Sequence, residues 1–144
     1  YNMIGMIVTG HGHFGTGLFS SVKLIAGEQK HLEAVDFDGN NVDLLRSDLE
    51  KAYEKLSDCE GVIVFSDLTG GSPFKTAVEL FLPKGNVRIV AGTNLGMLCE
   101  IALARTMMDD LDVLTDMAVT TGKTQVLKFE FAKVEEEEDF EDGI

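Results

Sequence analysis

The sequence contains few of the residues that mark several common protein classes. Among its 144 residues there are no tryptophans, two cysteines and two prolines. Cys59 and Cys99 form no metal-binding or redox spacing and lie beside apolar runs, so we expect buried free thiols and no disulfide. The longest early apolar run, residues 3–8, is too short for a signal peptide core or a membrane span, so we expect a soluble, cytoplasmic protein.

Basic residues are also scarce. The chain has 12 Lys and Arg against 25 Asp and Glu, a net charge of −13. This balance repels nucleic-acid phosphates and anionic lipid surfaces, so we expect no nucleic acid partner and no direct membrane insertion. Seven of the acidic residues fall in residues 135–142, which leaves the rest near −6. We therefore expect one domain over residues 1–133, followed by a solvated acidic tail over residues 134–144.

What the sequence does contain is a regular alternation of short apolar runs with amphipathic stretches. Strands are predicted over residues 3–8, 32–37, 61–65 and 87–91, and helices over 18–26, 42–56, 73–82, 95–107 and 111–121. Such alternation is typical of an α/β fold. We predict a single-domain, open and mostly parallel sheet with helices on both faces.

The last predicted strand, residues 125–132, differs from the others. Leu127, Phe129 and Phe131 alternate with Lys128 and Glu130, the period-2 pattern of a strand that is wet on one side. We expect it to lie antiparallel at a sheet edge or to pair with another chain.

Two unusual loops follow strands at the carboxyl end of the predicted sheet, where open α/β sheets bind ligands. The first, residues 9–17, contains Gly10-x-Gly12-x-x-Gly15, with Asp36 ending the next strand. This spacing resembles a dinucleotide-binding fingerprint. Against that interpretation, His11 places a bulky ring where a pyrophosphate should approach, and no substrate domain follows.

His11 is positioned for exposure because its neighbours on both sides lack side chains. His13 and His31 are interpreted as ordinary surface or loop histidines. The second loop, residues 66–74, begins with an ionisable residue, Asp67, and leads into a helix that starts at about Pro73.

The start of that helix is suited to anions. Gly70 and Gly71 are flexible, Ser72 suits the N-cap, and the first backbone N–H groups of a helix attract negative charge. Together with His11 and Asp67, this loop offers a nucleophilic imidazole, a carboxylate that fixes its tautomer, and a phosphate-sized site. The combination suits a phosphoryl group carried on histidine.

A hydrolase triad of Ser72, His11 and Asp67 is an alternative, because triads are defined by geometry and not by sequence order. However, the run from Gly70 to Phe74 lacks the second glycine of the G-x-S-x-G nucleophile elbow.

The chain resembles a known family, the IIA component of the mannose-type sugar phosphotransferase system, from Met3 to about Lys133. The motifs that carry the resemblance are the strand ending in Gly10-His11-Gly12, the block from Val64 to Phe74 that contains Asp67-Leu68-Thr69-Gly70-Gly71-Ser72-Pro73-Phe74, the segment from Ala91 to Leu98, and Thr121-Gly122-Lys123. A related branch serves as phosphocarrier of a dihydroxyacetone kinase system. It usually lacks the Gly-Gly-Ser-Pro run, so residues 70–73 favour the sugar-transport branch.

The resemblance implies a role for each matching position. His11 would accept a phosphoryl group on Nε2 from the phosphocarrier HPr and pass it to a IIB component, and Asp67 would bond the other ring nitrogen. Residues expected to bind the phosphoryl group are Gly12, Thr69, Gly70, Gly71 and Ser72. The family forms homodimers through the last strand and serves membrane IIC and IID components indirectly. We expect no metal or cofactor, and Phe14, Leu68 and Phe74 belong either to a docking surface or to the core.

Overall fold

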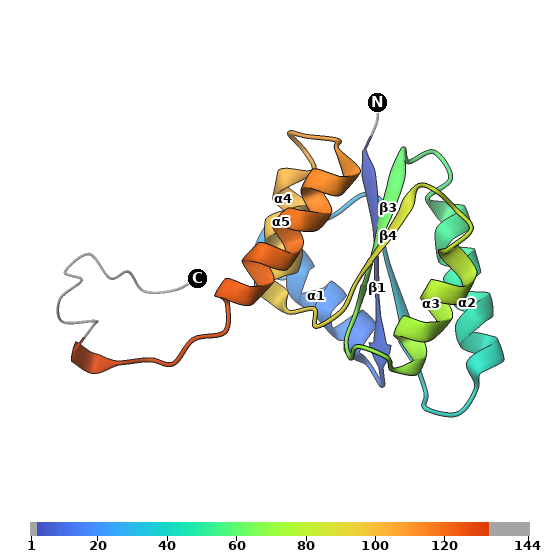
Figure 1. Cartoon of the computed structure of the whole chain (residues 1–144), viewed down its shortest axis with the longest axis horizontal. Coiled ribbons are helices and arrows are strands. Elements are labelled where there is room, and N and C mark those ends of the chain that lie inside the picture. The colour runs from blue at the N-terminus through green and yellow to red at the C-terminus, as the bar shows by residue number, and fades with distance from the viewer. Residues whose placement is uncertain (1–2, 133–144) are drawn as a thin grey trace.

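The computed structural model describes residues 3–132, in which strands and helices alternate as far as the fourth helix and a fifth helix follows it directly. They are β1 (Ile4–His11), α1 (Phe14–Ala26), β2 (Leu32–Phe37), α2 (Val42–Lys55), β3 (Gly61–Ser66), α3 (Ser72–Phe81), β4 (Val87–Val90), α4 (Leu95–Ala104) and α5 (Leu111–Thr124). The strands form one parallel sheet in the order β2-β1-β3-β4. Helices α1, α4 and α5 cover one face, and α2 and α3 cover the other (Figure 1). The predicted α/β architecture is confirmed.

The two central strands are apolar because helices cover them on both sides. All of β3 is buried, and so is all of β1 except His11. Their side chains alternate between two clusters, one on each face of the sheet. The first cluster, beneath α1, α4 and α5, includes Met6, Val8, Ile63 and Phe65, and the second, beneath α2 and α3, includes Ile7, Val62 and Val64.

Three of the five helices in the described residues begin at a side-chain cap. Asn41 accepts a hydrogen bond from the Leu44 amide (2.9 Å) at the start of α2. Asn94 and Asp110 cap α4 and α5 in the same way. Such caps satisfy amides that have no partner within the helix. Within residues 3–132, no helix is long and apolar enough to cross a membrane.

Three helix boundaries differ from the prediction by three residues or more, and one of them is the end of α4, which lies at Ala104 and not at residue 107. Helix α1 begins at Phe14 and not at Leu18, because Asp36 on β2 accepts hydrogen bonds from the amide (2.9 Å) and the hydroxyl (2.6 Å) of Thr16. A cap supplied by another strand leaves no local sequence signal. Helix α5 continues past Gly122, which was expected to end it. Gly122 is instead buried against Met97, where any side chain would collide with the methionine.

The predicted strand over residues 125–132 is wrong for this structure. Gln125 is the C-cap of α5, and residues 126–130 have no regular secondary structure. The segment leads away from the sheet (Figure 1), so no neighbouring strand supplies the hydrogen bonds that a strand requires. Its apolar side chains are exposed, with Leu127 at 76% and Phe131 at 77%. Pairing of this segment with another chain stays a prediction, and the acidic tail over residues 134–144 lies outside the described residues.

Candidate functional site

The two loops singled out in the sequence meet at the carboxyl edge of the sheet. β1 lies between β2 and β3, so the order of the strands reverses at this point, where open α/β sheets bind ligands. His11 is the last residue of β1, and Asp67 directly follows β3. Because Thr9 and Ser66 are paired in the parallel register, the two residues emerge side by side.

Asp67 holds His11 by two hydrogen bonds. The Oδ2 atom of Asp67 lies 2.7 Å from Nδ1 of the His11 ring. The same oxygen accepts a hydrogen bond from the backbone N–H of His11 at 2.8 Å. The carboxylate is mostly covered, with 11% of its side chain exposed, whereas 42% of the His11 side chain is exposed. Part of the imidazole is therefore accessible to another molecule, while the carboxylate that holds it is covered.

The environment of Asp67 determines which ring nitrogen carries the proton. Burial alone would raise the pKa of Asp67, but hydrogen bonds from the amide and ring of His11 and from the Leu68 amide outweigh it and hold the pKa below its usual value. An ionised carboxylate can only accept hydrogen bonds. The Nδ1 atom must therefore carry the proton, and Nε2 of the neutral ring keeps its lone pair as a nucleophile.

The Nε2 side of the ring lies against the start of α3. A Cβ atom at Gly71 would lie 2.9 Å from Cε1 and 3.6 Å from Nε2 of His11, so only glycine leaves the ring its present place. Ser72 was expected to be the N-cap, but Gly71 occupies that position and Ser72 is the first helical residue. The physical reason is that the Gly71 carbonyl already accepts the first helical bond, from the Lys75 amide at 2.9 Å.

The amides around the ring divide into two groups. The N–H of Gly12 donates to Phe37 (2.7 Å), and that of Gly71 donates to Leu68 (3.2 Å). The hydrogen bonds of residues 3–132 include none from the amides of Thr69, Gly70 or Ser72. These three amides, near the positive end of the α3 dipole, are the available donors for an anion.

One contact of the site was not predicted from the sequence. The ring of Phe37, at the end of β2, meets the His11 ring edge to face, with 5.6 Å between centroids. Phe37 reads as an ordinary apolar strand residue, so only the register of β1 with β2 shows that it supports the histidine.

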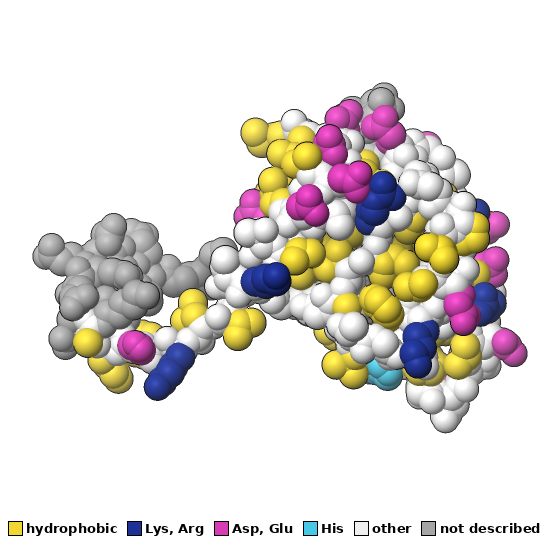
Figure 2. Space-filling model, viewed as in Figure 1, with side chains coloured by type: hydrophobic (Ala, Val, Ile, Leu, Met, Phe, Trp, Pro, Cys, Tyr) yellow, Lys and Arg dark blue, Asp and Glu magenta, His cyan; other side chains and the backbone are white. Residues whose placement is uncertain are grey.

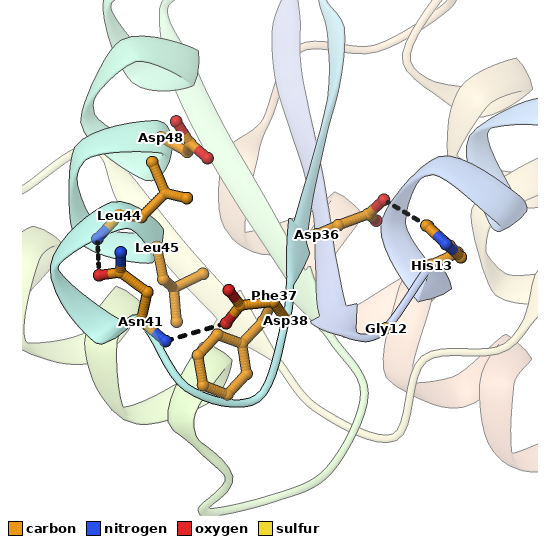
Figure 3. A pocket seen from close by; sticks show the side chains of 9 residues that line it. All are labelled: Gly12, His13, Asp36, Phe37, Asp38, Asn41, Leu44, Leu45 and Asp48. Atoms are coloured by element: carbon orange, nitrogen blue, oxygen red, sulfur yellow. Dashed lines mark hydrogen bonds and ion pairs between the residues drawn. The ribbon is translucent and has the colours of Figure 1, made fainter.

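A pocket of about 500 Å³ lies beside this site, on the other side of Gly12. Figure 3 shows Asp36 turned toward His13 (3.3 Å) and Asp38 bonded to the Asn41 amide (2.9 Å). Asp36 also holds Thr16, so it does not project freely as a ribose ligand would require. With Asp48 the pocket has three carboxylates, which repel a pyrophosphate, and the geometry gives the dinucleotide interpretation no support.

The geometry does not support a hydrolase triad of Ser72, His11 and Asp67. No hydrogen bond joins Ser72 to His11 among the described residues, so the nucleophile–base contact of a triad is not formed.

Of the three apolar residues near the site, Leu68 is 64% exposed. Phe14 and Phe74 are half-buried, Phe14 against the core under α1 and Phe74 in a groove beside β4.

Comparison with known proteins assigns the chain to a family. Residues 5–119 match the EIIA-man family model, described as the phosphotransferase system (PTS) fructose IIA component. A PTS mannose-specific EIIAB component of Escherichia coli (strain K12) is 31% identical over 133 residues, and the match covers 92% of this chain. It covers 41% of that protein, so the chain spans less than half of the relative's length.

Two further relatives match over nearly their whole length. The PTS fructose-specific EIIA component of Bacillus subtilis (strain 168) is 29% identical, and the match covers 92% of each chain. The crystal structure of a phosphotransferase system component EIIA from Streptococcus agalactiae is 32% identical, with a TM-score of 0.79 over 88% of this chain and 97% of that one. The chain therefore belongs to the mannose-type family of phosphotransferase system IIA components.

Proposed function

We propose that this chain is a cytoplasmic phosphocarrier of sugar uptake, in which His11 accepts a phosphoryl group from phospho-HPr and passes it to a IIB component. The observation that carries the proposal is the 2.7 Å contact between Asp67 and Nδ1 of His11, with Nε2 beside the start of α3. The family assignment supports the same chemistry. The membrane IIC and IID components would be served indirectly, through IIB.

The transfer follows from these positions. The lone pair of Nε2 attacks phosphorus in line, a new N–P bond forms, and the N–P bond to the donor histidine breaks. Asp67 stays ionised and stabilises the ring as it becomes positive. The amides of Thr69, Gly70 and Ser72, with the Ser72 hydroxyl, bind the phosphoryl oxygens. Gly12 and Gly71 instead shape the site, because their amides are already bonded within the chain.

A homodimer is the second part of the proposal, because two exposed features of one chain are complementary. β4 is an edge strand with one side unpaired in the sheet order. Beside it lies an apolar groove of about 390 Å³, lined in part by Phe74, Val78 and Ile89. Figure 2 shows hydrophobic side chains gathered on this face.

The exposed segment of residues 126–131 is complementary to this groove and to the unpaired edge of β4. It alternates apolar and charged residues, and an unpaired strand edge with an apolar surface favours addition of a strand from another chain. We infer that the segment of one protomer pairs with β4 of the other and packs Leu127, Phe129 or Phe131 into the groove.

Mass spectrometry of the intact protein tests the carrier function. The chain is mixed with enzyme I, HPr and phosphoenolpyruvate, beside the variants His11→Ala and His13→Ala. His13 is the matched control, since it is the next histidine and its side chain is 95% exposed. One acid-labile phosphoryl group on the wild type and on His13→Ala, and none on His11→Ala, is the expected result. No added mass while HPr itself is phosphorylated would overturn the proposal.

A further inference from the structure

A second group of reactive side chains lies at the opposite end of the sheet from His11. His31 directly precedes β2, and Asp58 and Cys59 lie just before β3. Because β2 and β3 flank β1, the fold brings the three residues together although they are far apart in the sequence. One ligand atom from each lies within 4.8 Å of the other two, and Nδ1 of His31 is 3.8 Å from Oδ1 of Asp58. The spacing of the cysteines alone indicated no such cluster.

The backbone around these residues is held in place. His31 has a left-handed conformation (φ 58°), and its carbonyl accepts hydrogen bonds from the Met6 amide (2.9 Å) and from buried Arg105 (3.0 Å). The Cys59 amide donates to Leu56 (2.9 Å), which closes the turn after α2. Two sides of the cluster are thus anchored before any ligand binds.

The same cluster is open to solvent. The side chains of His31 and Asp58 are 26% and 73% exposed, and Cys59 is half-buried. At 3.8 Å the imidazole and the carboxylate are too far apart for a hydrogen bond with each other. Among the described residues neither side chain has a hydrogen bond, so both keep lone pairs available for a ligand.

We propose that His31, Asp58 and Cys59 bind a zinc-class divalent metal ion. Thiolate, imidazole and carboxylate are the three ligand types of zinc, and three protein ligands leave a fourth position for water. Tetrahedral coordination at the usual bond lengths places ligand atoms about 3.4–3.6 Å apart, so side-chain rotations of about 1 Å close the site. Binding displaces the thiol proton into solvent. The ion then ties the segment before β2 to the segment before β3.

Titration of the full chain with Co²⁺ tests the site, since cobalt substitutes for zinc and its bond to thiolate gives a near-ultraviolet charge-transfer band. Carboxylates give no such band, so ions held by acidic residues alone are not counted. The expected result is one cobalt per chain, displaced by Zn²⁺. Cys59→Ser should abolish the band, whereas Cys99→Ser, at the other half-buried free cysteine, should retain it.

Two further variants keep the test independent of folding. Asp58→Asn changes a mostly exposed side chain, and His31→Asn keeps a residue type that tolerates positive φ. Each should weaken cobalt binding by about tenfold or more, with an unchanged melting temperature in the absence of metal. No band in the wild type, an undiminished band in Cys59→Ser, or equal loss in Cys99→Ser would refute the proposal.

Discussion

The substitution Gly71→Ala tests whether the placement of the His11 ring, and not only its presence, controls phosphoryl transfer. The new methyl group would lie 2.9 Å from Cε1 of the ring, whereas ordinary carbon contacts are about 3.5 Å or longer. The ring must therefore move by about 0.5–1 Å, away from the start of α3. A displacement of 1 Å costs on the order of a hundredfold in rate. We expect phosphorylation of Gly71→Ala to be about tenfold to a hundredfold slower.

Stability should change little in the same variant. Gly71 has φ −72° and ψ 169°, which alanine adopts without strain. The gain from a less flexible unfolded chain, about 0.4–1 kcal/mol, offsets the weaker N-cap preference of alanine. Gly85→Ala is the matched control, because a Cβ atom there meets nothing within 4 Å. Rapid-quench phosphorylation by phospho-HPr, read by intact mass, compares the two. Equal rates in both variants would refute the argument.

Three other predictions follow from the structure. Burial alone would raise the pKa of Asp67, but hydrogen bonds hold it below its usual 3.8, so this carboxylate stabilises the fold above about pH 4 and the stabilisation is lost as the pH falls through the lower folded pKa. In urea titrations, the free energy of unfolding of Asp67→Asn should therefore fall less steeply than that of the wild type as the pH is lowered from about 5 to about 2. An equally steep fall in both proteins would contradict this. Arg105→Ala should lower the free energy of unfolding in urea by about 3 kcal/mol, because this residue is only 2% exposed and its guanidinium donates to four oxygen acceptors. A loss below about 1 kcal/mol would count against this account. Leu127→Asp should shift the proposed dimer to monomer in sedimentation velocity, whereas Leu24→Asp should not, although Leu24 is 85% exposed and Leu127 76%. Dimers in both variants would exclude this interface.

The sequence allowed the parts of the site that depend on strand order to be predicted. Parallel strands bring their carboxyl ends to one edge, so His11 and Asp67 were expected to meet, and they do. The contribution of Phe37 could not be predicted, because an apolar residue at the end of a strand does not reveal which ring it contacts. The cap that Asp36 gives to α1 was missed for a similar reason, since it comes from a different element. Local patterns identify elements, whereas contacts between elements depend on register.

The segment of residues 125–132 shows that a sequence pattern can predict a strand without showing which strand would pair with it. Its alternation predicts a strand, yet a strand exists only where a neighbour supplies hydrogen bonds, and one chain leaves this segment without one. Apolar side chains as exposed as Val126 (82%) and Phe131 (77%) are costly unless something covers them. The outer edge of β4 has no strand paired with it, and the apolar groove beside it is uncovered. Exchange of a strand between two copies would account for both features, because the segment of one copy would pair with the β4 edge of the other. The Leu127→Asp experiment therefore tests whether the alternating pattern of residues 125–132 marks a strand that forms only in the dimer.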